Sequence, residues 1–137
     1  MWWIFALLSA FFSALTAILA KIGIKGINVD LAIAIRTTVI LVMTWGIAYF
    51  SGAIKNMQEL TKTNILFLVL SGITTGLSWL FYFKALEIGK LSQVAPVDKL
   101  SIAFTLLLSF LILKETADVK TVIGGLLVVA GTFVIIV

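Results

Sequence analysis

Five long apolar runs, separated by short polar connections, make up almost the whole chain. They cover residues 2–20, 31–50, 65–86, 91–113 and 121–137. Each has 17 to 23 residues, close to the roughly 20 with which an α-helix crosses the hydrocarbon core of a bilayer. Backbone groups in lipid must pair within their own segment, and no sustained alternation of apolar and polar residues indicates a barrel. The pattern predicts an all-α integral membrane protein with about five transmembrane helices in one domain, residues 1–137. A docked fifth helix that does not cross is the alternative, because that run is the shortest.

Composition narrows the possible functions. Apolar residues make up 62% of the 137 residues and charged residues 12%, against about 45–50% and 25% in soluble domains. The chain contains no Cys and no His, which excludes thiol chemistry, haem ligation and ordinary zinc sites. We therefore expect no enzyme, no metal and no cofactor. The net charge of +4 comes from single basic residues beside the apolar runs, as at membrane surfaces, so we expect no nucleic-acid partner.

The basic residues that flank the runs give no clear orientation in the membrane. With five spans, one side of the bilayer receives four of them, Lys55, Lys62, Lys114 and Lys120. The other side receives three, or five if residues just inside the helix ends are counted: Lys21, Lys25 and Lys90, then Arg36 and Lys84. Lys and Arg residues are in excess on the cytoplasmic side of membrane proteins. In this chain, the side with the excess depends on whether residues just inside the helix ends are counted. Either a subtler signal sets the orientation, or copies insert both ways and pair antiparallel, which is dual topology.

Two ionisable residues lie deep in the fourth run. Asp98 and Lys99 come seven and eight residues after Leu91, about 10 Å or more along a helix axis. Charged groups at this depth are costly and face protein or a water-filled cavity. Neighbouring residues on a helix point about 100° apart, so at least one of the two needs a partner on another helix, with Arg36 of the second run as a candidate. A structural ion pair and a substrate or proton site are both compatible with this pattern.

Small hydroxyl residues form one polar stripe on each of three predicted helices. Spacings of three and four residues place the members of a stripe on one helix face. The candidate pathway residues among them are Ser13 in the first run, Ser78 and Tyr82 in the third, and Ser101 and Thr105 in the fourth. Such residues are also ordinary packing residues between membrane helices. Taken together with Asp98 and Lys99, we expect the three stripes to line a common cavity.

Pro96 and Trp79 are two further candidates. Pro96 removes a helical hydrogen bond and restricts the residue before it. If the fourth helix starts near Leu91, the proline breaks it beside Asp98, an irregularity typical of transport sites; otherwise Pro96 marks the first helical turn. Trp79 lies about two-thirds of the way along the third run, deeper than the residues of interfacial aromatic belts. Stacking on an apolar or cationic ligand is the functional alternative to a place in the belt.

The fifth run carries glycines at the spacing of a helix face. Gly124 and Gly131 are seven residues apart, and so are Gly125 and Thr132. Faces of small residues let helices approach closely. We expect this helix, through Gly124, Gly125 and Gly131, to form the interface between two subunits rather than the pathway.

The second half of the chain carries the features of a known family. They lie in FYFKALEIGKLSQVAPVDKLSIAFTLLLSFLILKE, from Phe81 to Glu115, and in IGGLLVVAGTFVI, from Ile123 to Ile135. In order, they are an aromatic-x-x-Ala-Leu at the end of the third span, a Gly, an Ala-Pro that opens the fourth, a Lys-Glu exit and a Gly-rich fifth span. This pattern resembles the EamA-type repeat of the drug/metabolite transporter superfamily. At the level of five spans the resemblance covers the whole chain.

The resemblance implies a function and an assembly. Typical members carry two such repeats in opposite orientation and move small metabolites or amino acids, often outward, with the first four helices of each repeat lining the pathway. One repeat implies an antiparallel homodimer that exports small metabolites, amino acids or drug-like solutes across the plasma or inner membrane by alternating access. The small multidrug resistance proteins are similar in size but carry a Glu in the first helix, whereas no acid precedes Lys21; a proton-coupled cycle would then use Asp98. The alternatives are a passive pore or lipid flippase and a non-transporting membrane subunit.

Overall fold

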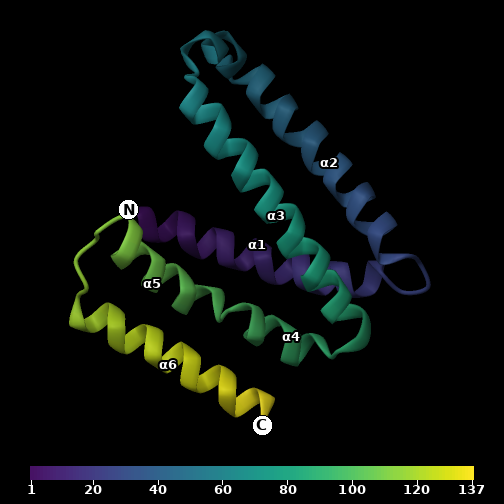
Figure 1. The fold of residues 1–137 in the computed structure, drawn as a ribbon. Helices are drawn as coiled ribbons and strands as arrows, with labels where there is room; N and C mark the ends of the chain where they lie inside the picture. Colours follow the sequence, from purple (N-terminus) through teal and green to yellow (C-terminus); the bar gives the residue numbers. More distant parts are fainter. The chain divides into compact units, whose positions relative to one another are not determined.

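The computed structural model describes residues 1–137 and contains helices joined by short turns (Figure 1). The bounds of the helices are α1 Trp2–Gly23, α2 Val29–Phe50, the 3-10 helix η1 Ala53–Glu59, α3 Lys62–Ile88, α4 Leu91–Asp98, α5 Ser101–Ile112 and α6 Val119–Ile136. Five segments are long and apolar enough to cross a membrane: α1, α2, α3, α4 with α5, and α6. The prediction of an all-α membrane protein with five spans is confirmed.

The chain divides into two compact units. Unit 1 consists of Met1–Ile18 and Ile88–Val137, and therefore contains most of α1 together with α4, α5 and α6. Unit 2 is Leu19–Glu87 and contains the end of α1, α2, η1 and nearly all of α3.

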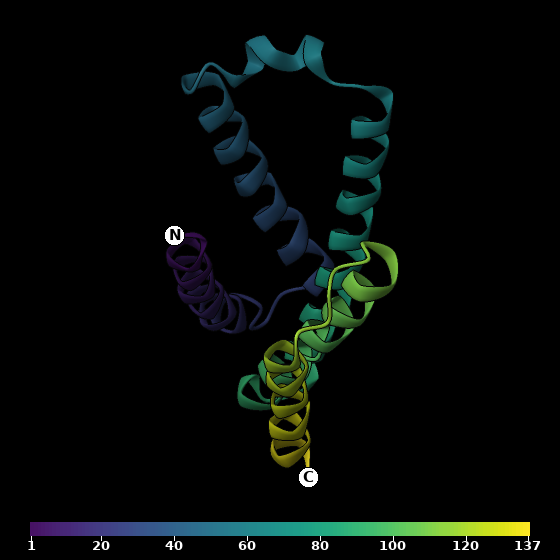
Figure 2. The same ribbon diagram turned by 90° about the vertical axis from the view of Figure 1, so that its left-hand side faces the viewer.

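In unit 2, α2 and α3 form a hairpin that starts at a capped helix end. The side-chain oxygen of Asn28 accepts the N–H of Asp30 at 2.8 Å, which satisfies one of the free donors at the start of α2. After α2, Gly52 has a φ of 76°, a left-handed conformation that glycine adopts without steric cost. η1 then joins the far ends of α2 and α3, which separate towards it (Figure 2).

The packed part of unit 2 lies at the C-terminal end of α3. Phe83 and Leu86 are the largest fully buried side chains of the chain, and Ile24 and Val29 beside the α1–α2 turn are also buried. Most apolar side chains along the spans remain on the protein surface. In a membrane protein lipid covers such side chains without a hydrophobic penalty. The buried core of unit 2 therefore lies at the end of the α2–α3 hairpin that is opposite η1.

In unit 1, α6 packs along α4 and α5 (Figure 1). The buried residues of α6 are Gly125 and Thr132, which lie about two turns apart on one face. A Cβ atom at Gly125 would lie 2.8 Å from Cδ1 of Leu106 in α5, whereas Gly124 and Gly131 face open space. Gly125, which the sequence assigns to an interface between chains, is thus used in a contact within the chain. An interface through Gly124 and Gly131 stays a prediction.

Candidate functional site

A guanidinium group lies over two aromatic rings between α2 and α3. The Cζ atom of Arg36 is 4.5 Å from the ring centroid of Trp79 and 5.3 Å from that of Phe83. Both distances fall within the roughly 6 Å range of cation–π attraction. Trp79 and Phe83 are four residues apart, so they lie above one another on one face of α3. The Tyr82 ring meets that of Phe83 edge-on, with the ring centroids 6.3 Å apart. The structure therefore brings three predicted pathway residues together, and we call Arg36, Trp79, Tyr82 and Phe83 the Arg36 cluster.

The Arg36 cluster presents a guanidinium group that the protein covers in part. Arg36 and Trp79 are half-buried and Phe83 is buried. A guanidinium carries five N–H donors in its plane and no acceptor, and aromatic rings stack on its face rather than accept from these donors. A cation of the chain itself therefore lies at the Trp79 ring, and stacking of a ligand on that ring stays a prediction. The donor edge of Arg36 is complementary to an oxyanion such as a carboxylate.

The fourth span is interrupted beside Asp98 and Lys99. α4 ends at Asp98 and α5 begins at Ser101, and Pro96 lies inside α4. Pro96 has no N–H to donate to the carbonyl four residues earlier. The backbone then tightens, because the N–H groups of Lys99 and Leu100 donate to carbonyls three residues back, at 3.1 and 3.0 Å. A 3-10 stretch inside a helix is typical of a hinge or a functional site.

Thr132 of α6 contacts this interruption. Its hydroxyl oxygen lies 3.3 Å from the carbonyl oxygen of Pro96 and 2.8 Å from that of Val128. A hydroxyl has a single proton, so Thr132 donates to one of the two carbonyls at a time. The side chain is only 3% exposed, which holds the hydroxyl at the break. α6 therefore supports the fourth span where its own hydrogen bonding is irregular.

The remaining predicted pathway residues lie on the surface of the chain. The exposed ones in unit 1 are Ser13, Asp98, Lys99, Ser101 and Thr105, and the exposed one in unit 2 is Ser78. Thr16 lies three residues after Ser13 in α1, and Thr75 lies three residues before Ser78 in α3, so both belong to these stripes. Their hydroxyls donate at 2.8 Å to carbonyls four residues earlier. Such bonds satisfy a hydroxyl within its own helix, as in ordinary helix packing. A common cavity lined by the three stripes stays a prediction.

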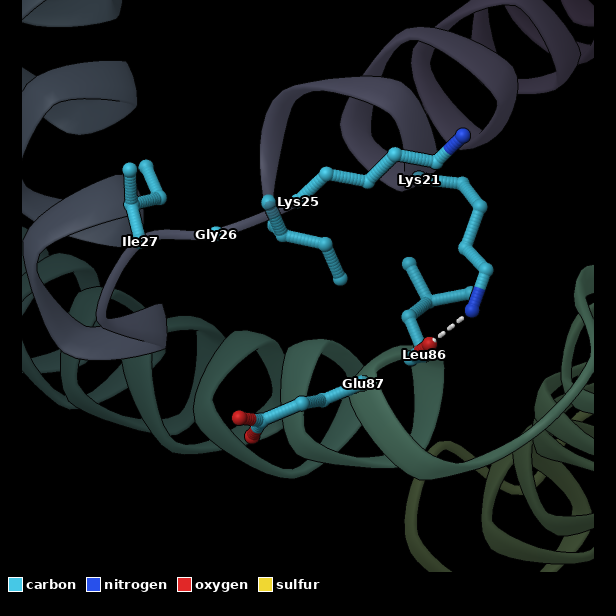
Figure 3. Close-up of a pocket in the computed structure, with 7 residues that line it drawn as sticks. Lys21, Lys25, Gly26, Ile27, Leu86 and Glu87 are labelled. Atoms are coloured by element: carbon cyan, nitrogen blue, oxygen red, sulfur yellow. Dashed lines mark hydrogen bonds between the residues drawn. The ribbon is translucent and has the colours of Figure 1, made fainter.

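Two contacts involve residues that the sequence did not indicate. Phe83 completes the Arg36 cluster, and its spacing of four from Trp79 is a signal that could have found it. Lys21 donates through Nζ to the carbonyl of Leu86 (Figure 3), one of the last four carbonyls of α3, which have no helical donor. A cation also suits the negative end of the helix dipole. The sequence marks Lys21 only as a flanking charge, and no spacing rule links it to a residue 65 positions away.

Comparisons with known proteins agree with the arrangement of five spans. The model of the EamA-like transporter family matches residues 1–137. A curated relative from Sinorhizobium sp, named "Uncharacterized transporter in cobO 3'region", is 43% identical over 134 residues, which make up 98% of this chain and 95% of the relative. No solved structure matches the chain. The resemblance seen in the sequence is therefore confirmed over the whole length: the chain belongs to the EamA-like transporter family and is a multi-pass membrane transporter rather than an enzyme.

Proposed function

We propose that the protein is a secondary transporter of the cell membrane that exports small metabolites, amino acids or drug-like solutes by alternating access. The observation that carries this proposal is the Arg36 cluster, in which a guanidinium within a span rests on Trp79 and Phe83. A charged group inside a span is costly and is kept where it serves a substrate or an ion. The donor edge of Arg36 suits solutes that carry a carboxylate. Outward transport is proposed from the family resemblance.

The interruption of the fourth span supports a transport cycle in which helices move relative to one another. Irregular helices within spans border the binding sites of many secondary transporters, where one bundle of helices rocks against another. Asp98 and Lys99 lie at the interruption of this chain. In the proposed cycle Asp98 is the group that takes up a coupling proton, and Lys99 is its neighbouring cation.

The direct test is reconstitution of the purified protein in lipid vesicles. The vesicles are loaded with an unlabelled amino acid, and the labelled compound is added outside. A carrier should then accelerate entry of the labelled compound, because its binding site returns to the outer face occupied by the unlabelled one. We expect this counterflow in the parent. Transport driven by a pH gradient, which requires the coupling proton, should fall about tenfold in Asp98→Asn and in Lys99→Gln, which corresponds to a loss of about 1.4 kcal/mol. Unchanged gradient-driven transport in both variants would remove the pair from the mechanism.

Further measurements on the reconstituted protein distinguish the alternative functions. A passive pore gives channel-sized currents in a voltage-clamped bilayer and no counterflow. A flippase moves labelled lipid between leaflets without solute flux. A non-transporting subunit gives neither, and it co-purifies with a different chain at a fixed stoichiometry. Any of these results in place of counterflow contradicts the proposed carrier.

We also propose that two copies form the functional unit, most simply an antiparallel homodimer. One repeat covers 95% of the curated relative, and alternating access commonly uses two repeats of inverted topology. The nearly balanced flanking charges are compatible with insertion in both directions. We expect tags at both termini to be accessible from both sides of the membrane. One fixed orientation of the termini would exclude the antiparallel form.

Variants with altered flanking charge test the antiparallel homodimer through its transport activity. Asn56→Lys with Gln58→Lys adds positive charge at η1. Lys55→Gln with Lys62→Gln removes positive charge from η1 and the start of α3, so the two double variants should insert in opposite fixed orientations. We expect each variant alone to be inactive and co-expression of the two to restore transport. Full activity of either variant alone, in one orientation, argues for a parallel assembly or a monomer.

A further inference from the structure

The connection between the second and third spans is a short helix with one apolar row. η1, Ala53–Glu59, is a 3-10 helix, in which residues three apart lie directly above one another. One row contains Ile54 and Met57 and continues to Leu60, whose N–H donates to the carbonyl of Met57 at 3.3 Å. Apart from Ala53, the other two rows of η1 consist of polar residues: Lys55, Asn56, Gln58 and Glu59. η1 is therefore amphipathic.

The rest of the chain leaves most of this apolar row uncovered. Met57 is 52% exposed and Leu60 is 44% exposed, whereas Ile54 is half-buried. η1 contacts α2, but none of its residues is buried. The buried residues of unit 2 lie at the opposite end of the α2–α3 hairpin. A partner that covers Met57 and Leu60 therefore comes from outside the chain.

The position of η1 between two span ends points to the bilayer as that partner. α2 ends at Phe50 and α3 begins at Lys62, and both helices are long and apolar enough to cross a membrane. The ends of such spans lie at the boundary between hydrocarbon and headgroups. The exposed ring of Tyr49 at the end of α2, which meets the Phe50 ring edge-on, independently marks this level, because tyrosines concentrate at membrane interfaces.

We propose that η1 lies in the plane of the membrane interface, with Ile54, Met57 and Leu60 directed towards the acyl chains and the two polar rows towards water. Interfacial amphipathic helices bury their apolar face about 5–10 Å into the boundary between headgroups and acyl chains. Lys55 on a polar row keeps its ammonium group among the headgroups. The far ends of α2 and α3 separate towards η1 (Figure 2), so the bilayer, rather than a protein core, fixes this end of the hairpin.

The test uses single cysteines, because the chain contains none. Met57→Cys and the matched control Gln58→Cys each receive a nitroxide spin label, and the full-length protein is placed in lipid nanodiscs, where both faces of the bilayer are open to the solution. Power-saturation EPR then measures how accessible each label is to oxygen, which concentrates among acyl chains, and to a polar nickel chelate, which stays in water. We expect oxygen to dominate at position 57 and the nickel chelate to dominate at position 58.

A scan of single labels from position 54 to position 60 tests the row itself. We expect the ratio of oxygen to nickel accessibility to peak at every third position, namely 54, 57 and 60. A uniformly low ratio at all positions places η1 in water and overturns the proposal. Low accessibility of position 57 to both reagents means that a protein, such as a second copy of the chain, covers the row, and this result also overturns it.

Discussion

Replacing Arg36 with Gln is expected to lower the transport of carboxylate-bearing solutes about 10- to 100-fold. The variant keeps most of the side-chain length but loses the charge and the paired donors of the guanidinium. Hydrogen bonds to a charged group are worth about 1.5–3 kcal/mol, which corresponds to this range. Uptake of an amino acid and of its amide, which lacks the carboxylate, is measured side by side in vesicles and provides the readout. The loss should be confined to the compound that carries the carboxylate.

Control variants distinguish recognition of the carboxylate by Arg36 from stabilisation of the α2–α3 hairpin. Arg36→Lys keeps the charge but not the planar fork, so we expect intermediate transport of the acid. Trp79→Phe keeps an aromatic face under the guanidinium, whereas Trp79→Leu removes it and should resemble Arg36→Gln in part. Thermal unfolding of each purified variant shows whether the fold is retained. Equal losses for the acid and the amide would assign Arg36 a structural role, and counterflow that persists with both compounds would still leave the protein a carrier.

A leucine at position 125 is expected to destabilise the contact between α5 and α6. A Cβ atom at Gly125 would already lie 2.8 Å from the end of the Leu106 side chain, and a larger side chain cannot be accommodated by a rotation of Leu106 alone. Overpacking of this kind costs about 1–3 kcal/mol. Gly125→Ala should be nearly neutral, because the tip of Leu106 can shift and alanine favours the helix. The thermal unfolding midpoint of the purified protein in detergent measures the difference.

The neighbouring glycine provides the matched control. Gly124 faces open space, so Gly124→Leu should leave the stability of the single chain unchanged. If Gly124 lies in the predicted interface between copies, the same variant should shift the protein from dimer to monomer in a cross-linking experiment. Leu106→Ala should restore the stability of Gly125→Leu but should not affect Gly124→Leu. Equal destabilisation by the two leucine variants would contradict the packing of α6 on α5.

The spans themselves were predictable from the sequence because they depend on local properties. Each run of residues is long and apolar enough to cross the bilayer, and its backbone hydrogen bonds close within the segment. Trp79 was indicated by its distance from the span ends, since a large aromatic side chain away from the membrane interface requires an explanation. Arg36 was indicated as a charge just inside the second span and a candidate partner for the pair of Asp98 and Lys99. Pro96 lies five residues after Leu91 and two before Asp98, and this position likewise raised the possibility of a break in the fourth span.

Only the tertiary structure decided which side chains meet. Whether Arg36 lies over Trp79 and Phe83, whether Gly125 or Gly124 faces α5, and whether Lys21 reaches the end of α3 depend on how each helix is rotated about its axis and shifted along it. Lipid does not specify these two variables, because it solvates every apolar face of a helix equally well. They follow from a few close contacts between side chains, such as the one between Gly125 and Leu106. The sequence by itself therefore determined a transporter of five membrane spans, and the structure decided which residues of those spans form its candidate site.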